Sequence, residues 1–296
     1  TPKLVIAQCC AGIIGSFPAL NARPQEKLDE WIVVIKEALA RWNAAHPERP
    51  AAPFAVNQIV HRSNDRLAKD MEACVRHQVP IVICSLGARE DVYQAIHSYG
   101  GVVLHDVINT FFAQKAISKG ADGLIPVAAG AGGHAGVISP FALIEEIREW
   151  FAGPIALSGA IATGGGVLAA EAMGADFAYI GSAFVATEEA NAPAAYKQAI
   201  VDGTADDIVY TNLFTGVHGN YLKPSIIAAG LDPDTLPESD PSKMDFGSGG
   251  ASAAKAWKDI WGSGQGIGAV KSVVPVAALV DRLEREYRQA RRRLMS

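Results

Sequence analysis

Two stretches of the chain share one pattern: Lys119-Gly-Ala-Asp-Gly-Leu-Ile125 and Met173-Gly-Ala-Asp-Phe-Ala-Tyr-Ile180. Each begins at the end of an amphipathic segment and continues as a short apolar run, which predicts a helix that turns directly into a strand. Because both passages contain Gly-Ala-Asp between the helix and the strand, this weak internal repeat indicates a chain built from repeated βα units. The fold is therefore expected to be α/β with a parallel sheet.

The alternation continues outward from these two stretches in both directions. Apolar runs that are continuous rather than alternating favour strands of a parallel sheet covered by helices on both faces. Seven strands are expected, at Gly12–Ser16, Phe54–Asn57, Ile81–Ser85, Val102–Asp106, Gly123–Val127, Ile155–Ser158 and Phe177–Gly181. Helices are expected between them, at Lys27–Asn43, Asp65–Arg76, Asp91–Ser98, Thr110–Lys119, Pro140–Phe151 and Gly165–Met173.

Seven strands in βα order favour a (β/α)8 TIM barrel over an open doubly wound sheet. The chain opens on a helical pattern at Thr1, so the first strand of the barrel is expected to precede residue 1. The barrel is expected to span residues 1–186, a small helical and loop elaboration or lid 187–270, and a closing C-terminal helix 271–296. A simple linker is the alternative for the middle part, which is rich in Pro, Asp, Gly and Ser between 231 and 252.

Composition excludes several classes of protein. With 296 residues, 49% hydrophobic and 19% charged, the chain can bury a large core and is neither disordered nor fibrous. Its net charge of −5 argues against nucleic acid, and the six arginines from Arg282 to Arg293 alternate with acidic residues as on a solvated helix. No apolar run reaches the roughly 18 residues of a membrane helix, and no signal peptide is visible. We therefore expect a cytoplasmic protein, with a homo-oligomer left open.

Small residues follow the last two expected strands, at Ser158-Gly-Ala160 and Gly181-Ser-Ala183. Each turn leads into a helix start, so backbone N–H groups converge where (β/α) barrels commonly hold a phosphate. The alternative is that small residues merely permit tight turns. Because two consecutive units share the feature, we predict phosphate binding.

One histidine, His134, lies among small residues in Gly130–Gly136, on a turn expected to face the barrel mouth. Imidazole is the side chain best matched to proton transfer near neutral pH, so His134 is a candidate catalytic residue. His105 and Asp106 are adjacent on a strand and should point to opposite faces. The cysteines Cys9, Cys10, Cys74 and Cys84 are expected to be free thiols, and no metal-ligand spacing or GxSxG motif is present.

The chain also carries, in order, Pro53-Phe-Ala-Val-Asn57, Gly120-Ala-Asp-Gly123, Ala131-Gly-Gly-His-Ala-Gly136, Leu157-Ser-Gly-Ala-Ile-Ala162, Gly174-Ala-Asp176 and Tyr179-Ile-Gly-Ser182. In order and spacing these motifs resemble the nitronate monooxygenases, formerly called 2-nitropropane dioxygenases. Relatives of that family include FMN-dependent enoyl-acyl-carrier-protein reductases and NADH:quinone reductases. The resemblance covers Pro2 to Ala186 and resumes at Trp261-Gly-Ser-Gly-Gln-Gly266.

The resemblance implies a TIM barrel that holds FMN non-covalently. By position, Gly159, Ala160, Gly181 and Ser182 would meet the phosphate, Asn57 the isoalloxazine or its side chain, and Gly132 would place backbone beside the ring. His134 falls where the family carries its catalytic histidine. Two positions depart from the family: Val127 replaces the usual Gln, and Gly159-Ala160 replaces Gly-Gly. The alanine keeps its N–H donor in place provided that its φ stays negative.

The activity implied is the oxidation of a small alkyl nitronate or nitroalkane by O2, giving a carbonyl compound and nitrite. Two alternatives stay open. One is an FMN-dependent NAD(P)H reductase of a quinone or an enoyl thioester. The other belongs to a different class, a phosphate-binding barrel without flavin.

Overall fold

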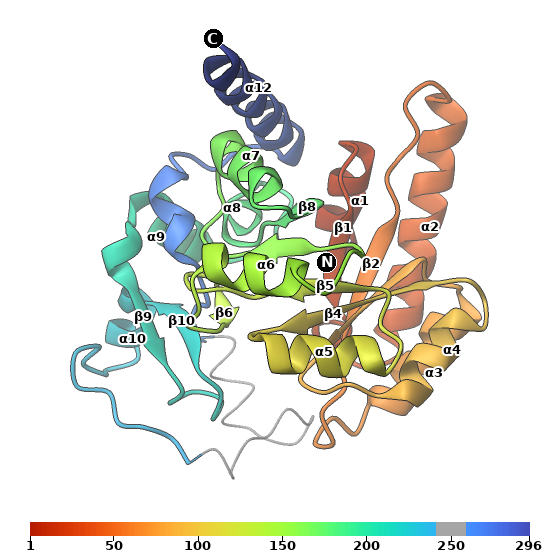
Figure 1. The fold of residues 1–296 in the computed structure, drawn as a ribbon, viewed down its shortest axis with the longest axis horizontal. Helices are drawn as coiled ribbons and strands as arrows, with labels where there is room; N and C mark the ends of the chain where they lie inside the picture. Colours follow the sequence, from red (N-terminus) through yellow and green to blue (C-terminus); the bar gives the residue numbers. More distant parts are fainter. Residues whose placement is uncertain (241–258) are drawn as a thin grey trace.

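The computed structural model describes residues 1–240 and 259–296, and its centre is a parallel sheet (Figure 1). Five strands pair in chain order, and isolated bridges Leu124↔Ile155 and Val127↔Ser158 connect the fifth to a further parallel pair. Seven parallel strands thus follow one another around the sheet, as predicted. They are β1 (Gly15–Pro18), β2 (Phe54–Ile59), β3 (Ile81–Ser85), β4 (Val102–Val107), β5 (Gly123–Pro126), β7 (Ala156–Ser158) and β8 (Phe177–Tyr179).

Helices cover the outer face of this sheet (Figure 1). Side chains of alternate strand residues therefore enter two apolar layers. Outward residues such as Val56 and Leu124 pack against the helices in the larger core, whereas Ala55, Ile83 and Ile125 fill the barrel interior. The helices are α1 (Pro2–Cys10), α2 (Lys27–Ala45), α3 (Leu67–Arg76), α4 (Glu90–His97), α5 (Thr110–Ser118), α6 (Pro140–Arg148) and α7 (Gly164–Ala172).

The two outer strands of the series, β1 and β8, face each other without pairing. Across this opening Ser16 Oγ lies 3.4 Å from Tyr179 Oη. Among the described residues, no strand pairs with the second edge of either β1 or β8. A barrel of eight strands would have one more here, and the strand expected before Thr1 stays a prediction.

The first strand begins later than the sequence indicates. The apolar residues Ile13 and Ile14 suggested a strand at Gly12–Ser16, but β1 starts at Gly15. Gly12 has φ +90°, its N–H donates to Cys9 O, and the N–H of Ile13 donates to Gln8 O. These residues cap the C-terminus of α1. Gly12 and Ile13 therefore belong to the helix end and not to the strand.

The elaboration contains an antiparallel sheet beside its helices, which the sequence analysis did not foresee. Strand β6 (Gly133–His134) pairs with β10, which pairs with β9, and Gly219 lies opposite His134. Residues 241–252 of the Pro- and Gly-rich stretch lie outside the described residues. The elements are α8 (Ser182–Val185), α9 (Ala194–Asp202), η2 (Ala205–Asp207), β9 (Ile208–Thr211), β10 (Gly219–Leu222), α10 (Lys223–Ala228), η4 (Gln265–Ala269) and α12 (Val276–Met295).

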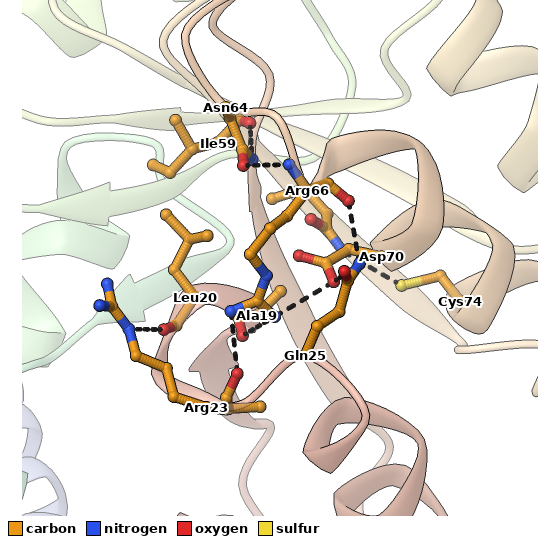
Figure 2. Close-up of polar contacts among 11 residues, drawn as sticks. Ala19, Leu20, Arg23, Gln25, Ile59, Asn64, Arg66, Asp70 and Cys74 are labelled. Atoms are coloured by element: carbon orange, nitrogen blue, oxygen red, sulfur yellow. Dashed lines mark hydrogen bonds and ion pairs between the residues drawn. The ribbon is translucent and has the colours of Figure 1, made fainter. Parts of the chain in front are cut away.

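A buried ion pair fixes the loop after β1, which includes η1 (Ala19–Asn21), against α3 (Figure 2). Arg66 Nη2 lies 3.2 Å from Asp70 Oδ1, and both side chains are almost fully buried. Arg66 also donates to Ala22 O at 2.9 Å, and Gln25 Nε2 donates to Asp70 Oδ1 at 3.0 Å. Loss of either charge would leave the other buried and unpaired, so this cluster holds the loop in one place.

Two further sequence expectations can be compared with the structure. All four cysteines are free thiols, and burial raises the pKa of Cys9 to about 11. Across the described part of the chain, no helix combines the length and apolar character that crossing a bilayer requires. The cytoplasmic location stays a prediction.

Candidate active site

The turns after β7 and β8 lie together at the carboxyl ends of their strands, where the sequence predicts a phosphate site. They line a cavity of about 260 Å3 with the Gly130–Gly133 turn and the late 260–266 segment. Five of the predicted cofactor residues line it: Gly132, Gly159, Ala160, Gly181 and Ser182.

Backbone donors in this cavity are available for an anion. Within the described residues, the N–H groups of Ala160, Gly181 and Ser182 donate no hydrogen bond to another part of the protein. Ala160 and Gly181 are exposed and Ser182 is half-buried, so these N–H groups are accessible to a ligand. Ser182 Oγ accepts from Gly264 N at 2.9 Å, so its own proton can point to a ligand. The donor set suits a phosphate group.

The late segment approaches the cavity through glycines that cannot carry a side chain. A Cβ on Gly132 would lie 2.7 Å from Gly264 N, and a Cβ on Gly266 would lie 2.6 Å from Ala160 O. Tyr196 stacks on Trp261 with ring centroids 5.0 Å apart, and its hydroxyl donates to Gly262 O. The close packing of these backbone segments, together with the Tyr196–Trp261 pair, therefore forms one wall of the cavity.

Ala160 does not meet the condition set for it from sequence. Its φ is +53°, in the left-handed region, and Gly159 before it has φ +150°. A left-handed conformation costs a residue with a Cβ roughly 1–2 kcal/mol. Ala160 nevertheless lines the cavity, and its N–H has no hydrogen-bond partner among the described residues. The alanine is thus tolerated, at some cost in backbone strain, in the set of N–H donors from Ala160, Gly181 and Ser182, which is called the cradle below.

We expect Ala160→Gly to raise the free energy of unfolding by about 0.5–1 kcal/mol, because relief of the left-handed strain exceeds the extra entropy of the unfolded glycine. Urea denaturation measures the change. Gly159→Ala is the matched control and should destabilise the protein, because its φ of +150° and the 3.0 Å approach of Ala129 O oppose a Cβ. Equal effects of the two variants would contradict the argument.

His134 lies next to this cavity, on strand β6 rather than on the flexible turn that the sequence suggested. Pairing with Gly219 of β10 fixes its backbone. Its Nε2 lies 2.9 Å from Thr215 Oγ1. Burial lowers the pKa of His134 to about 4, so the ring is neutral at physiological pH and can accept a proton.

Asn57, near the end of β2, is half-buried and is not among the residues that line the cavity. Its Nδ2 donates to Ser85 Oγ at 2.6 Å. Ser85 in turn hydrogen-bonds the side chain of Asp106. The inward-facing ends of β2, β3 and β4 thus form one polar chain at the barrel mouth.

Asp106 is the residue of this chain that the sequence analysis left unassigned. As predicted, it faces away from its neighbour His105, whose Nδ1 lies 2.8 Å from Tyr93 Oη on the helix side. Ser85 and the Leu86 N–H hydrogen-bond its carboxyl, but burial dominates and raises the pKa of Asp106 to about 6. The inward position at a strand end was the available signal, since barrel sites are built there.

Asp106→Asn should stabilise the protein by about 3 kcal/mol at pH 7.5 and by only about 0.5 kcal/mol at pH 4. The unfolded carboxyl ionises near 3.8 and the folded one near 6. The free energy of unfolding of the wild type is therefore highest below about pH 3.8, falls as the pH rises to about 6, and changes little above that. In the variant this contribution is absent, because the amide does not titrate. Urea denaturation at the two pH values tests this, and an equal difference at both would show that burial of the charge is not the cause.

The fold and this cavity define a class of protein, a (β/α)-barrel enzyme with backbone N–H donors gathered at the carboxyl ends of its last strands. Residues 17–286 match the nitronate monooxygenase family. A nitronate monooxygenase of Paraburkholderia phytofirmans is 31% identical over 330 residues, which cover 98% of this chain and 90% of that protein. The chain belongs to the nitronate monooxygenase family and is a flavin oxidoreductase.

Two solved structures share the fold over nearly the whole chain. Nitroalkane oxidase from Streptomyces ansochromogenes superposes with a TM-score of 0.79 at 23% identity, covering 99% of this chain and 94% of that one. FabK from Thermotoga maritima gives 0.80 at 23% identity, covering 100% and 91%. Among residues 1–240 and 259–296, no group of three His, Cys, Asp or Glu side chains could hold a metal ion.

Proposed function

We propose that this protein binds FMN and oxidises alkyl nitronates with O2, giving a carbonyl compound and nitrite. The observation that carries the proposal is the convergence of N–H groups without protein partners, from Ala160, Gly181 and Ser182, beside the neutral His134. Phosphate recognition by such groups needs no cationic side chain. Membership of the nitronate monooxygenase family supports the choice of cofactor and substrate.

Residues of this chain would hold FMN in three places. Gly159, Ala160, Gly181 and Ser182 would bind the phosphate, Gly132 would bring backbone beside the ring, and Asn57 would contact the isoalloxazine. When bound, FMN supplies the electron transfer between the substrate and O2. The Val127 position offers no side-chain hydrogen bond to the cofactor.

His134 would handle the proton. A neutral nitroalkane must lose its α-proton before it can be oxidised, and a neutral imidazole is a suitable base. For a substrate already present as the nitronate, the same ring would hydrogen-bond a nitro oxygen instead. The half-buried position of His134 limits access of water to this step.

The test is the visible absorption spectrum of the purified protein, before and after addition of FMN. Heating and identification of the released chromophore then establish the cofactor, and nitrite release from nitroethane or its nitronate establishes the reaction. Bleaching by NAD(P)H without O2, with turnover of a quinone or an enoyl thioester and no nitrite, would favour the reductase. Protein that stays colourless after addition of FMN would overturn both.

A further inference from the structure

Asn57 and Ser85 end neighbouring strands on the inner face of the barrel. Asn57 lies two residues beyond Ala55 on β2, and Ala55 belongs to the barrel interior. Ser85 lies two residues beyond Ile83 on β3, which belongs to the same apolar layer. Because side chains alternate along a strand, both polar groups face the interior at its open end. A hydrogen bond from Ser85 extends the series to Asp106 at the end of β4.

The hydroxyl of Ser85 lies between a donor and an acceptor. Its Oγ is 2.6 Å from Asn57 Nδ2, a nitrogen that can only donate. Its other partner is the Asp106 carboxyl, whose pKa of about 6 leaves it ionised at pH 7.5, so that it can only accept. Ser85 therefore gives its one proton to Asp106 and accepts a proton from Asn57.

A second acceptor requires the same orientation of the Asn57 amide. The backbone oxygen of Ile83 lies 3.4 Å from Asn57 Nδ2 and can only accept. If the amide were turned over, its oxygen would face the Ile83 oxygen with no proton between them. It would also compete with Asp106 for the single proton of Ser85. The turned amide thus satisfies fewer groups, and Nδ2 belongs on the β3 side.

This orientation leaves the amide oxygen of Asn57 for another partner. Both hydrogen bonds that the Asn57 side chain makes with described residues are donated by Nδ2. Its Oδ1 carries two lone pairs that can accept. Asn57 is half-buried rather than sealed into the core. A ligand that reaches this side chain would therefore meet an acceptor and not a donor.

The turn after Ser85 is built around the same carboxyl. Leu86 has φ +60°, in the left-handed region that is unfavourable for a residue with a Cβ, and its N–H hydrogen-bonds Asp106. Strained backbone of this kind persists only where the surrounding structure holds it, and it is concentrated at functional sites. Ser85 itself is buried. The hydroxyl and the carboxyl thus have defined positions.

We propose that Ser85, oriented by Asp106, is a positioning residue that holds the Asn57 amide with Nδ2 toward β3, so that Oδ1 accepts a hydrogen bond from the isoalloxazine of FMN. The orientation of the amide follows from hydrogen bonds within the chain, whereas the contact with the ring rests on the proposed function. Ser85 acts on the cofactor only through Asn57.

The first test is FMN affinity, measured by fluorescence titration of the whole chain. Asn57→Ala should weaken binding about 10-fold, and Ser85→Ala about 5-fold, because an amide without its partner no longer keeps one orientation. The double variant should bind FMN no more weakly than Asn57→Ala alone. A merely structural effect of Ser85 would instead multiply with the effect of Asn57→Ala.

The second test is NMR of the side-chain amides of the 15N-labelled protein at pH 7.5, with and without FMN. The Asn57→Ala spectrum identifies the signal of Asn57. We expect strong nuclear Overhauser effects between the Nδ2 protons of Asn57 and the Cβ protons of Ser85 in the wild type. They should persist when FMN is bound, because Oδ1 is the atom that faces the ligand.

The outcomes separate the two levels of inference. Absence of these Overhauser effects in the wild type overturns the proposal, as does unchanged FMN affinity in Ser85→Ala or a double variant whose loss is the product of the two single losses. If Ser85→Ala does not fold, the wild-type spectra and Asn57→Ala decide. If the Overhauser effects are present but the wild type does not bind FMN, then the proposed function fails while the orientation of Asn57 by Ser85 stands.

Discussion

His134→Asn is expected to lower turnover of a neutral nitroalkane by about 100- to 10,000-fold while FMN stays bound. Asparagine has a similar polar size but cannot accept the α-proton. His134 belongs to β6 and does not line the phosphate cavity, so the cradle should keep its affinity. Nitrite release measures the turnover, and the flavin absorption of the same sample measures the bound cofactor.

The preformed nitronate gives an internal comparison for the same variant. Its α-proton is already gone, so the loss with nitronate should be much smaller than with the neutral nitroalkane. His218→Asn is the control histidine, since its exposed ring stacks on Tyr210 near the same loop. Equal losses on both substrates would assign His134 to binding the nitro group, and unchanged turnover would remove it from the reaction.

The pH dependence of the wild-type activity is a second test of His134 as the base. Because burial lowers the pKa of His134 to about 4, the base stays deprotonated down to that pH. The acid limb of kcat/KM on nitroalkane should therefore lie near pH 4, well below the ordinary histidine value of about 6.5. A limb near 6.5 would mean that the ring is solvated in the working enzyme.

Much of the barrel could be predicted from sequence because its strands are buried on both faces. A continuous apolar run such as Ile81–Ser85 fits a strand in the middle of a sheet that is covered on both faces, and all five of its residues are buried. The start of β1 could not be predicted, because Ile13 is as apolar as a strand residue but completes a helix cap. Strands β6 and β10 were not predicted, because β6 has only two residues and pairs with a segment about 85 positions away in the sequence.

The candidate site divides in the same way. The place of Gly159, Gly181 and Ser182 in the cavity was predictable because a strand followed by small residues leaves backbone N–H groups at the turn. Asp106 and Thr215 were not, since their partners come from other units of the fold: Ser85 from the preceding strand, and His134 from across the small antiparallel sheet. Local backbone geometry is encoded in neighbouring residues, whereas the side chains that tune a base depend on packing over long separations.

Gly164→Ala is expected to cost about 4 kcal/mol of folding free energy and to weaken FMN binding as well. Gly164 begins α7 where α12 crosses it, and a Cβ there would lie 2.1 Å from Leu283 O and 2.2 Å from Tyr287 N. These are backbone atoms, so no side-chain rotation can relieve the clash and α12 must move. Figure 1 shows α12 packed on α7 near its own start and projecting from the body beyond it.

The displacement would reach the cavity at the strand ends through Arg282 of α12, which donates to Ala162 O and to Ala269 O at 3.1 Å each. Ala162 lines the same cavity as Ala160, so a shift of α12 should displace the residues that would bind the phosphate. Gly165→Ala is the matched control, because the nearest atom to its Cβ is 3.8 Å away and alanine is the better helix former. It should leave FMN affinity unchanged and raise stability slightly. Fluorescence titration of FMN and urea denaturation of both variants test the pair, and a Gly164→Ala protein as stable as Gly165→Ala would show that the helix crossing is not fixed by this glycine.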